Sequence, residues 1–269
     1  IIMVVYAFST AAGDFTLENF ARMGTYTAVF TRSFKLAIIA TLIALLIGYP
    51  VSYMLSKEGP QVQRIAMVLI MLPMWMNFLL RTYSWMSILE NNGLLNQLFQ
   101  QIGLIDLYNQ IAMHFASDPA AYVPIDHFQM IGTQGAVVLG MVYNYLPFMI
   151  LPIYSVLVKL DHSLIEAARD LGASSVQVFR KVILPLSLPG VLSGITMVFV
   201  PSVSTFAISR LLGGGTQMML GDLIEQQFLG GAYNPQLGAA IALVMMAIVV
   251  VCMLVMNRFG DGEEQAVML

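Results

Sequence analysis

Long stretches with almost no charged side chains constrain this chain more than any other feature. Five of them are both apolar and long, over about 34–56, 65–89, 135–158, 190–211 and 237–257. A helix needs about 20 mostly apolar residues to cross the hydrocarbon core of a bilayer. Lipid offers the backbone no hydrogen-bond partners, so crossing segments are helices or closed barrels, and these runs lack the alternation of barrel strands. The pattern therefore predicts an all-α membrane protein built as a helical bundle.

The composition supports this class and excludes others. Hydrophobic residues make up 58% of the 269 residues and charged residues only 10%, whereas a soluble domain is about 25% charged. The net charge of −3, without a basic patch, argues against nucleic-acid binding. Residues 1–8 are apolar but too short to cross a membrane, and we interpret them as the end of a further helix. We expect one membrane domain over 1–269, with five complete spans and this partial one.

The orientation of the spans follows from Lys and Arg residues near their ends, which are enriched on the cytoplasmic side. One set of alternating connections, 56–64, 159–189 and the tail from 257, carries Lys57, Arg64, Lys159, Arg169, Arg180, Lys181 and Arg258. The other set carries only Arg22, Arg32 and Lys35. The first set is therefore predicted to be cytoplasmic. In the long outer connection, residues 94–107 are expected to form one short amphipathic helix against the membrane.

Catalytic motifs are missing from the sequence. There is no G-x-x-x-x-G-K-[ST] run, since Gly213–Gly215 is followed by Thr216 and Gln217, and a phosphate-binding loop needs the lysine. There is also no H-E-x-x-H, no pair of cysteines and no G-x-S-x-G. We expect no enzymatic activity, no metal site and no cofactor on this chain. If it moves a solute uphill, the energy must come from a partner or from an ion gradient.

The cytoplasmic connection 159–189, called the coupling loop below, differs from the rest of the chain. Ser163 and Glu166 match a capping box, Gly172 suits the left-handed residue that closes a helix, and Ser174 and Gln177 can cap a second helix. Apolar residues at helical spacing give each helix one apolar face, with Leu164, Ala168 and Leu171 in the first and Val176, Phe179 and Val182 in the second. Pro185 is expected to end the second helix. The pattern predicts a compact protrusion that fits a groove on another protein.

This loop also carries a recognisable motif. Its residues are Glu166-Ala167-Ala168, then Gly172 after three residues, Val182 after nine, and Leu184-Pro185 after one. The spacing resembles the EAA motif of permease subunits in bacterial ABC importers, which usually have Ile where this chain has Val182. The resemblance implies that the loop docks into a cleft of an ATP-binding subunit. The positions implied in coupling are Glu166, Ala167, Ala168, Arg169, Asp170, Gly172, Leu184 and Pro185.

Other segments narrow the resemblance to the polyamine branch of that family. They are Pro73–Trp85, Asn92–Asn96, Leu146–Met149, Leu151–Tyr154 and Arg169–Ser174. The resemblance implies a multi-pass protein of the bacterial inner membrane. Its implied partners are a second homologous permease, an extracytoplasmic binding protein and two ATP-binding subunits that carry ATP and Mg²⁺. Importers of sulfate, molybdate, iron or thiamine remain alternatives. A gradient-driven carrier is disfavoured, because it needs ionisable groups at mid-bilayer and the five spans have none in their middle.

A polyamine path would need groups that replace the water around ammonium groups. Carboxylates, amide oxygens and aromatic faces can do so. The candidates are Glu90, Asp222 and Glu225 as acids, Trp75, Tyr83, Trp85, Tyr143 and Tyr145 as aromatic faces, and Asn77 and Asn144 as polar contacts. Anchoring at the membrane interface is the alternative role for the aromatic residues. Arg81 would repel a cation, and we interpret it as an interface or structural pairing residue.

Overall fold

The computed structural model describes residues 2–10, 12–115, 122–231 and 233–267, and this part of the chain is almost entirely helical. The α-helices are α1 (Ile2–Ala7), α2 (Glu18–Arg22), α3 (Thr27–Ser56), α4 (Pro60–Met71), α5 (Phe78–Leu89), α6 (Leu94–Gln101), α7 (Leu104–Phe115), α8 (Gln134–Leu157), α9 (His162–Asp170), α10 (Ser175–Val178), α11 (Leu184–Ser204), α12 (Ala207–Leu212), α13 (Leu220–Leu229) and α14 (Pro235–Val267). Short 3-10 turns cover Met23–Tyr26 and Leu72–Trp75, and a π-helical turn covers Phe179–Ile183. The all-α membrane class is therefore confirmed.

Within the described residues, four continuous helical stretches are long and apolar enough to cross a bilayer. They are Glu18–Ser56, Gln134–Leu157, Ser175–Ser204 and Pro235–Val255. The segment predicted as a span over 65–89 is not one straight helix, because Pro60–Trp75 and Phe78–Gln101 meet at an angle of 90°, and counted as one bent span this pair gives the five predicted spans. Met76 between them has an extended backbone, and Asn77 starts a new helix. The partial span at 1–8 corresponds to α1, with Ile1 outside the described residues.

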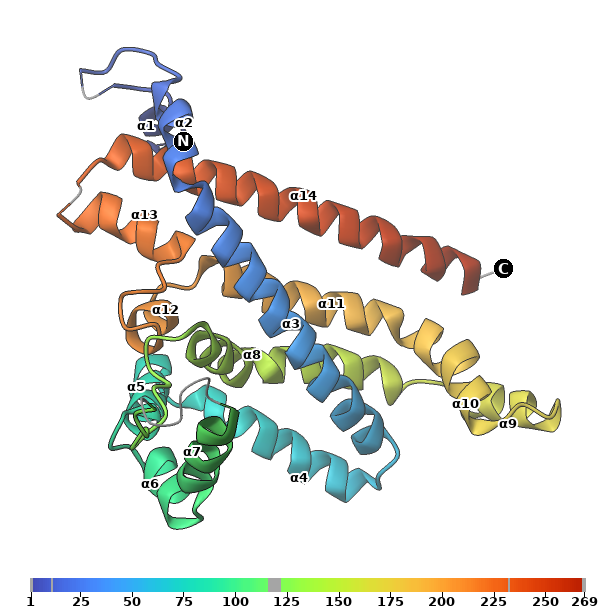
Figure 1. The fold of residues 1–269 in the computed structure, drawn as a ribbon. Coiled ribbons are helices and arrows are strands. Elements are labelled where there is room, and N and C mark those ends of the chain that lie inside the picture. The colour runs from blue at the N-terminus through green and yellow to red at the C-terminus, as the bar shows by residue number, and fades with distance from the viewer. Residues whose placement is uncertain (1, 11, 116–121, 232, 268–269) are drawn as a thin grey trace.

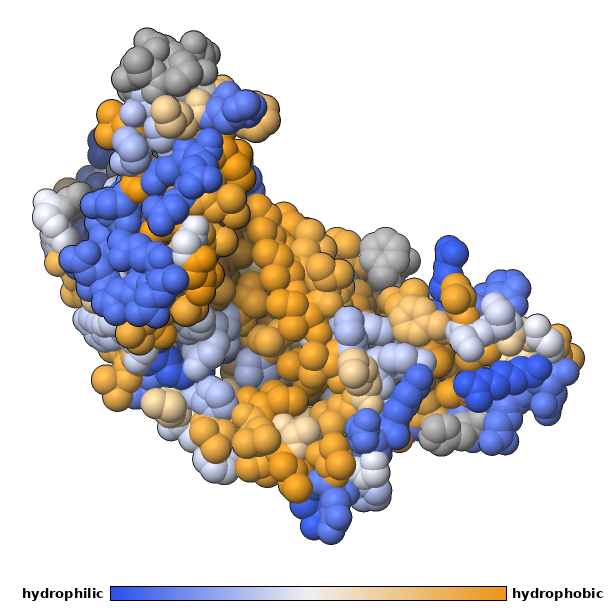
Figure 2. Space-filling view, turned by 60° about the horizontal axis from the view of Figure 1, so that its bottom comes forward, coloured by the Kyte–Doolittle hydropathy of each residue, from blue (hydrophilic) through white to orange (hydrophobic). Residues whose placement is uncertain are grey.

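The long helices run side by side and place the short ones at two opposite ends (Figure 1). α3, α8 and α11 pack against one another at the centre. The α9–α10 segment lies at one end, and α5, α6, α7, α12 and α13 lie at the other. Figure 2 shows hydrophilic residues gathered toward both ends, with a hydrophobic surface between them. This distribution matches a bundle that spans a membrane.

Small residues bring the central helices close together. A Cβ at Gly190 of α11 would lie 2.8 Å from the Pro152 carbonyl oxygen of α8, and a Cβ at Gly194 would lie 2.8 Å from Met149 Sδ. Such close backbone approach is a common way for helices to pack in lipid, where apolar side chains gain little from leaving the solvent. The core of the bundle therefore depends on glycine at the α8–α11 crossing.

The fourth span begins and ends elsewhere than predicted. Its helix already includes the π-helical turn and α11 from Leu184, inside the segment 159–189 that was assigned to the coupling loop. It stops at Ser204, Thr205 is extended, and α12 follows as a separate helix. The continuous span predicted over 190–211 is thus interrupted. The prediction over 237–257 falls within α14.

The outer connection folds as two helices rather than one. The helix predicted over 94–107 is divided into α6 and α7 at Gly103, which has a φ of +71°. That left-handed conformation is open to glycine and ends α6. The prediction of a single amphipathic helix is therefore wrong.

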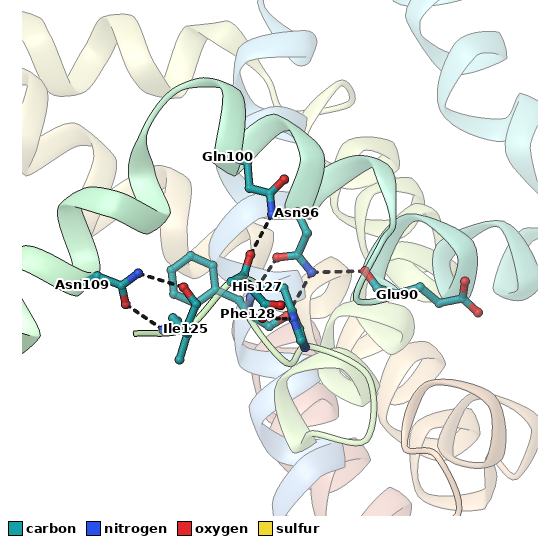
Figure 3. Close-up of polar contacts among 8 residues, drawn as sticks. Glu90, Asn96, Gln100, Asn109, Ile125, His127 and Phe128 are labelled. Atoms are coloured by element: carbon teal, nitrogen blue, oxygen red, sulfur yellow. Dashed lines mark hydrogen bonds and ion pairs between the residues drawn. The ribbon is translucent and has the colours of Figure 1, made fainter. Parts of the chain in front are cut away.

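Two asparagines attach the following segment to these helices (Figure 3). The Asn96 Nδ2 donates to the carbonyls of Glu90 (3.1 Å) and Phe128 (3.0 Å), and the Phe128 amide donates to Asn96 Oδ1 (2.9 Å). Asn109 makes the same pair of bonds with the backbone of Ile125. Each side-chain amide thus satisfies backbone groups as a neighbouring strand would.

Candidate functional site

The first helix of the coupling loop, α9, begins at His162 and is capped by Asp161. The Asp161 carboxylate accepts a hydrogen bond from the Ser163 amide at 2.9 Å. The capping box predicted from Ser163 and Glu166 is therefore wrong. A carboxylate two residues earlier serves as the cap, which leaves Glu166 exposed on the second turn.

The end of α9 follows the sequence prediction. Gly172 has a φ of +81°. The Ala173 amide donates to the Ala168 carbonyl at 3.1 Å and the Gly172 amide to the Arg169 carbonyl at 2.8 Å. These two bonds form a Schellman motif, which satisfies carbonyls that the helix leaves free. Ser174 and Gln177 then form the predicted capping box of α10.

Pro185 does not end the second helix, contrary to expectation. α10 continues through the π-helical turn Phe179–Ile183 into α11, in which Pro185 sits in the first turn. Here the Leu184 amide bonds to the Phe179 carbonyl, five residues back. The wider turn accommodates a proline, which has no N–H to donate. The coupling loop is thus joined to a span without a flexible link.

The coupling loop has an inner and an outer face. Ile165, Ala168 and Phe179 pack against a buried apolar cluster to which α3, α8, α10 and α11 all contribute. Leu164, Leu171 and Val176 are 47%, 90% and 66% exposed. The apolar face predicted from Leu164, Ala168 and Leu171 is therefore divided, because Ala168 lies on the inner face and the two leucines lie on the outer face. We call the exposed residues Leu164, Glu166, Ala167, Asp170, Leu171 and Val176 the coupling surface, because exposed apolar residues with polar neighbours are typical of an interaction site.

The remaining coupling candidates lie off this surface. Leu184 and Pro185 are in the first turn of α11, at the base of the protrusion, and Arg169 lines a cavity facing α3. Aromatic rings join the base to α3, since Phe179 lies 5.9 Å from the Tyr49 ring and 5.5 Å from the Tyr53 ring. The Tyr49 hydroxyl and Ser187 Oγ are 2.8 Å apart. Sequence reasoning missed these contacts, because nothing local marks them.

At the opposite end, α5, α12, α13 and the outer half of α8 form what we call the outer layer. Trp85 of α5 and Tyr143 of α8 are in edge-to-face contact, with centroids 5.3 Å apart. Tyr145 lies near Thr205 and Arg81. Asn144 is buried and its Nδ2 donates to the Gly140 carbonyl. The structure thus brings together three of the predicted path residues, since Trp85 contacts Tyr143 and both Trp85 and Tyr145 pack against one buried cluster, whereas the printed bond of Asn144 stays within α8.

Other path candidates do not join this group. Trp75 is 76% exposed at the end of the 3-10 turn, and Tyr83 is 48% exposed on α5. Asn77 caps α5, with its Oδ1 accepting from the Leu79 amide at 2.8 Å. The Glu90 side chain is exposed. Asn77 therefore has a structural role that the sequence analysis did not assign.

Arg81 is buried, with 8% of its surface exposed. Its Nε and Nη1 atoms have no hydrogen-bond partner among the described residues. The pairing predicted for this residue is therefore not found within this part of the chain.

Asp222 and Glu225 line one cavity of about 160 Å³, together with Arg210 and Gln217. Asp222 is buried, and its Oδ2 accepts from the Met219 amide at 2.9 Å. Burial raises the pKa of the Asp222 carboxyl, while hydrogen bonds from Ser209 and Met219 partly oppose that rise. Arg210 Nη1 contacts both Glu225 oxygens at 2.9 Å. The cavity has the size and charge to take a small cationic group, and the Arg210 guanidinium forms part of its lining.

Comparisons with known proteins agree with the helical membrane fold and with the permease motif of the coupling loop. The family model for the binding-protein-dependent transport system inner membrane component matches residues 40–262. The spermidine/putrescine permease PotB of Escherichia coli is 36% identical over 246 residues, which cover 91% of this chain and 82% of that protein. PotB of Haemophilus influenzae is 37% identical over 240 residues, covering 87% and 77%.

Solved structures share the fold. A bacterial ABC transporter that imports the acidic polysaccharide alginate superposes with a TM-score of 0.74, at 14% identity, over 97% of this chain and 87% of that one. The MetNI methionine ABC transporter in an inward-facing conformation gives 0.58, at 19% identity, over 92% and 98%. The chain belongs to the family of binding-protein-dependent transport system inner membrane components.

Proposed function

We propose that this chain is a permease subunit of an ATP-driven importer that carries polyamines into the cytoplasm by alternating access. The observation that carries the proposal is the coupling surface. It exposes Leu171 and Val176 at the end of the bundle predicted to be cytoplasmic, and a continuous helix leads from it into the span of α11.

Force applied to the coupling surface would be transmitted by packing rather than by a hinge. α9 is closed by the Schellman bonds at Gly172 and packs against α10 and the π-helical turn, and α10 continues into α11. Phe179 and the Tyr49–Ser187 hydrogen bond fix this base to α3. Tilting the protrusion would therefore move α3 and α11 together.

The substrate proposal is supported by the PotB relatives, whose names specify spermidine and putrescine. Residues of the outer layer suit such a solute. Glu225 and Asp222 line the same cavity and could receive one ammonium group in place of Arg210, and the Trp85–Tyr143 pair offers aromatic faces. A slender polycation with several amines could contact both groups in sequence.

The partners proposed are a second homologous permease, two ATP-binding subunits with their ATP and Mg²⁺, and an extracytoplasmic binding protein. The family description supports the binding protein. On this proposal ATP is hydrolysed by the partner, and the present chain converts the resulting closure into movement of its spans.

Gly172 provides the test of coupling. No atom lies within 4 Å of a Cβ at this position, yet its φ is +81°. Gly172→Val should therefore distort the coupling loop without a clash, at about 1–2 kcal/mol of local strain, whereas Gly172→Asn tolerates the conformation better. In the reconstituted complex, polyamine-stimulated ATPase activity should fall sharply in the valine variant and be largely kept in the asparagine variant. Equal stimulation in all three proteins would contradict the proposal.

Two measurements separate the alternatives. Uptake into vesicles with ATP and no ion gradient distinguishes an ATP-driven importer from a gradient-driven carrier. Labelled putrescine should bind the cognate extracytoplasmic protein. If sulfate or thiamine bound instead, the polyamine assignment would be overturned and the importer assignment kept.

A further inference from the structure

A cavity of about 560 Å³ lies between the coupling loop and the spans, apart from both the coupling surface and the outer layer. Its walls include Ser56 at the end of α3 and Val158 just after α8. Both helices qualify as membrane spans and end there. The cavity therefore lies at the depth of the lipid headgroups of the cytoplasmic leaflet.

Two cationic side chains stand at this cavity without a carboxylate partner. Lys57 and Arg169 both line it and are exposed, and neither forms an ion pair with the described residues. The Lys57 ammonium sits 3.8 Å from the centroid of the Tyr53 ring, which holds it at the rim. Glu58 is the one acid among the lining residues. The cavity therefore carries an excess of positive charge.

The deeper wall is apolar. Val178 and Ile183 are buried, and Ile165 is half-buried beside them. The side-chain amide of Gln63 is committed, since it donates to the carbonyls of Ser56 and Glu58 and accepts from the Tyr154 hydroxyl. A ligand that fits must combine an anionic group for the rim with apolar atoms for the wall.

We propose that this cavity binds the headgroup of an anionic phospholipid from the cytoplasmic leaflet. Lys57 and Arg169 contact the phosphate, and the glycerol and first methylene groups lie against Ile183 and Val178. Basic pockets between spans on this side of a membrane are suited to such headgroups. Because Lys57 extends from the end of α3 and Arg169 belongs to α9, the lipid would bridge the span and the coupling loop and stiffen their junction.

Lipid retention by the purified complex tests this site. The complex is placed in nanodiscs of phosphatidylcholine containing a minor fraction of phosphatidylglycerol, extracted with detergent and analysed by native mass spectrometry. Wild type should retain phosphatidylglycerol in preference to phosphatidylcholine. Lys57→Gln should lower this retention by about fivefold, the effect expected of one cation near an anionic headgroup. Lys57→Arg should restore it.

Lys159→Gln is the matched control, because Lys159 is an exposed cation on the same side that does not line the cavity. Its retention of phosphatidylglycerol should equal that of wild type. Equal retention by Lys57→Gln, equal retention of the two lipids, or displacement by excess inorganic phosphate alone would overturn the proposal. The readout involves neither ATP hydrolysis nor polyamine, so failure here would leave the proposed function untouched.

Discussion

The coupling loop and the outer layer lie at opposite ends of the same helices, and they are stabilised in different ways. Bonds that shape the coupling loop join residues at most five apart, as at Asp161, Gly172 and Ser174. The outer layer has local bonds too, such as that from the Met219 amide to Asp222, but it also has partners that are distant in sequence. The Leu220 amide, for example, donates to the buried Ser33 Oγ, 187 residues away, at 2.8 Å. The protruding part of the loop is thus shaped locally and exposes apolar residues, whereas the outer layer also depends on contacts between distant segments.

The strongest test of this difference is Gly221→Ala in the outer layer. A Cβ there would lie 2.5 Å from the backbone oxygens of Ser204 and Thr205, where α13 crosses the end of α11. Backbone cannot yield as a side chain can, so we expect a loss of about 2–3 kcal/mol. The thermal midpoint of the purified permease should fall by roughly 5–10 °C. Gly24→Ala, which has no atom within 4 Å, is the control, and equal melting of the two variants would refute the packing argument.

A smaller effect, and one on coupling alone, is expected of Leu171→Asp. Leu171 is 90% exposed, so its replacement should leave the thermal midpoint of the permease unchanged. Loss of a central apolar anchor weakens an interface by about tenfold or more. We expect poor co-purification of the ATP-binding subunit and weak polyamine-stimulated ATPase activity. Val123→Asp, at an 80% exposed site on the outer side, should show neither defect. If it impaired coupling equally, the effect of Leu171→Asp could not be assigned to the coupling loop.

The smallest effect concerns the pH dependence of stability at Asp222, whose pKa is raised mainly by burial. The folded protein holds this proton more tightly than the unfolded chain does. The free energy of unfolding therefore falls as pH rises from about 4 through the raised pKa. Asp222→Asn removes this pH-dependent fall in the free energy of unfolding, because the amide does not titrate. Its oxygen can still accept a hydrogen bond from the Met219 amide.

The variant should consequently melt slightly higher than wild type at neutral pH, and the gap should close toward about pH 4. Polyamine transport should fall at the same time, because a carboxylate is lost from the cavity. Asp106→Asn, at an exposed acid of α7, should change neither property. A lower midpoint for Asp222→Asn across the whole pH range would show that burial is not what dominates this carboxyl.

The sequence alone predicted the helical membrane class, the unequal distribution of Lys and Arg between the two ends of the bundle, and the glycine that closes α9. Each depends on composition or on bonds within a few residues, and these are legible in a single chain. The sequence prediction failed where a second residue or another helical geometry could take the same structural role. Asp161 replaced Ser163 as the cap, and the π-helical turn carried the helix past Pro185.

Tertiary structure decided the rest. The burial of Arg81 and the cavity that Asp222 and Glu225 share with Arg210 and Gln217 depend on how separate helices pack together. Apolar runs reveal which segments leave water, but not which of their faces meet. In lipid that choice is made by close packing of small residues and by matched polar groups, and both need the partner helix to be in place.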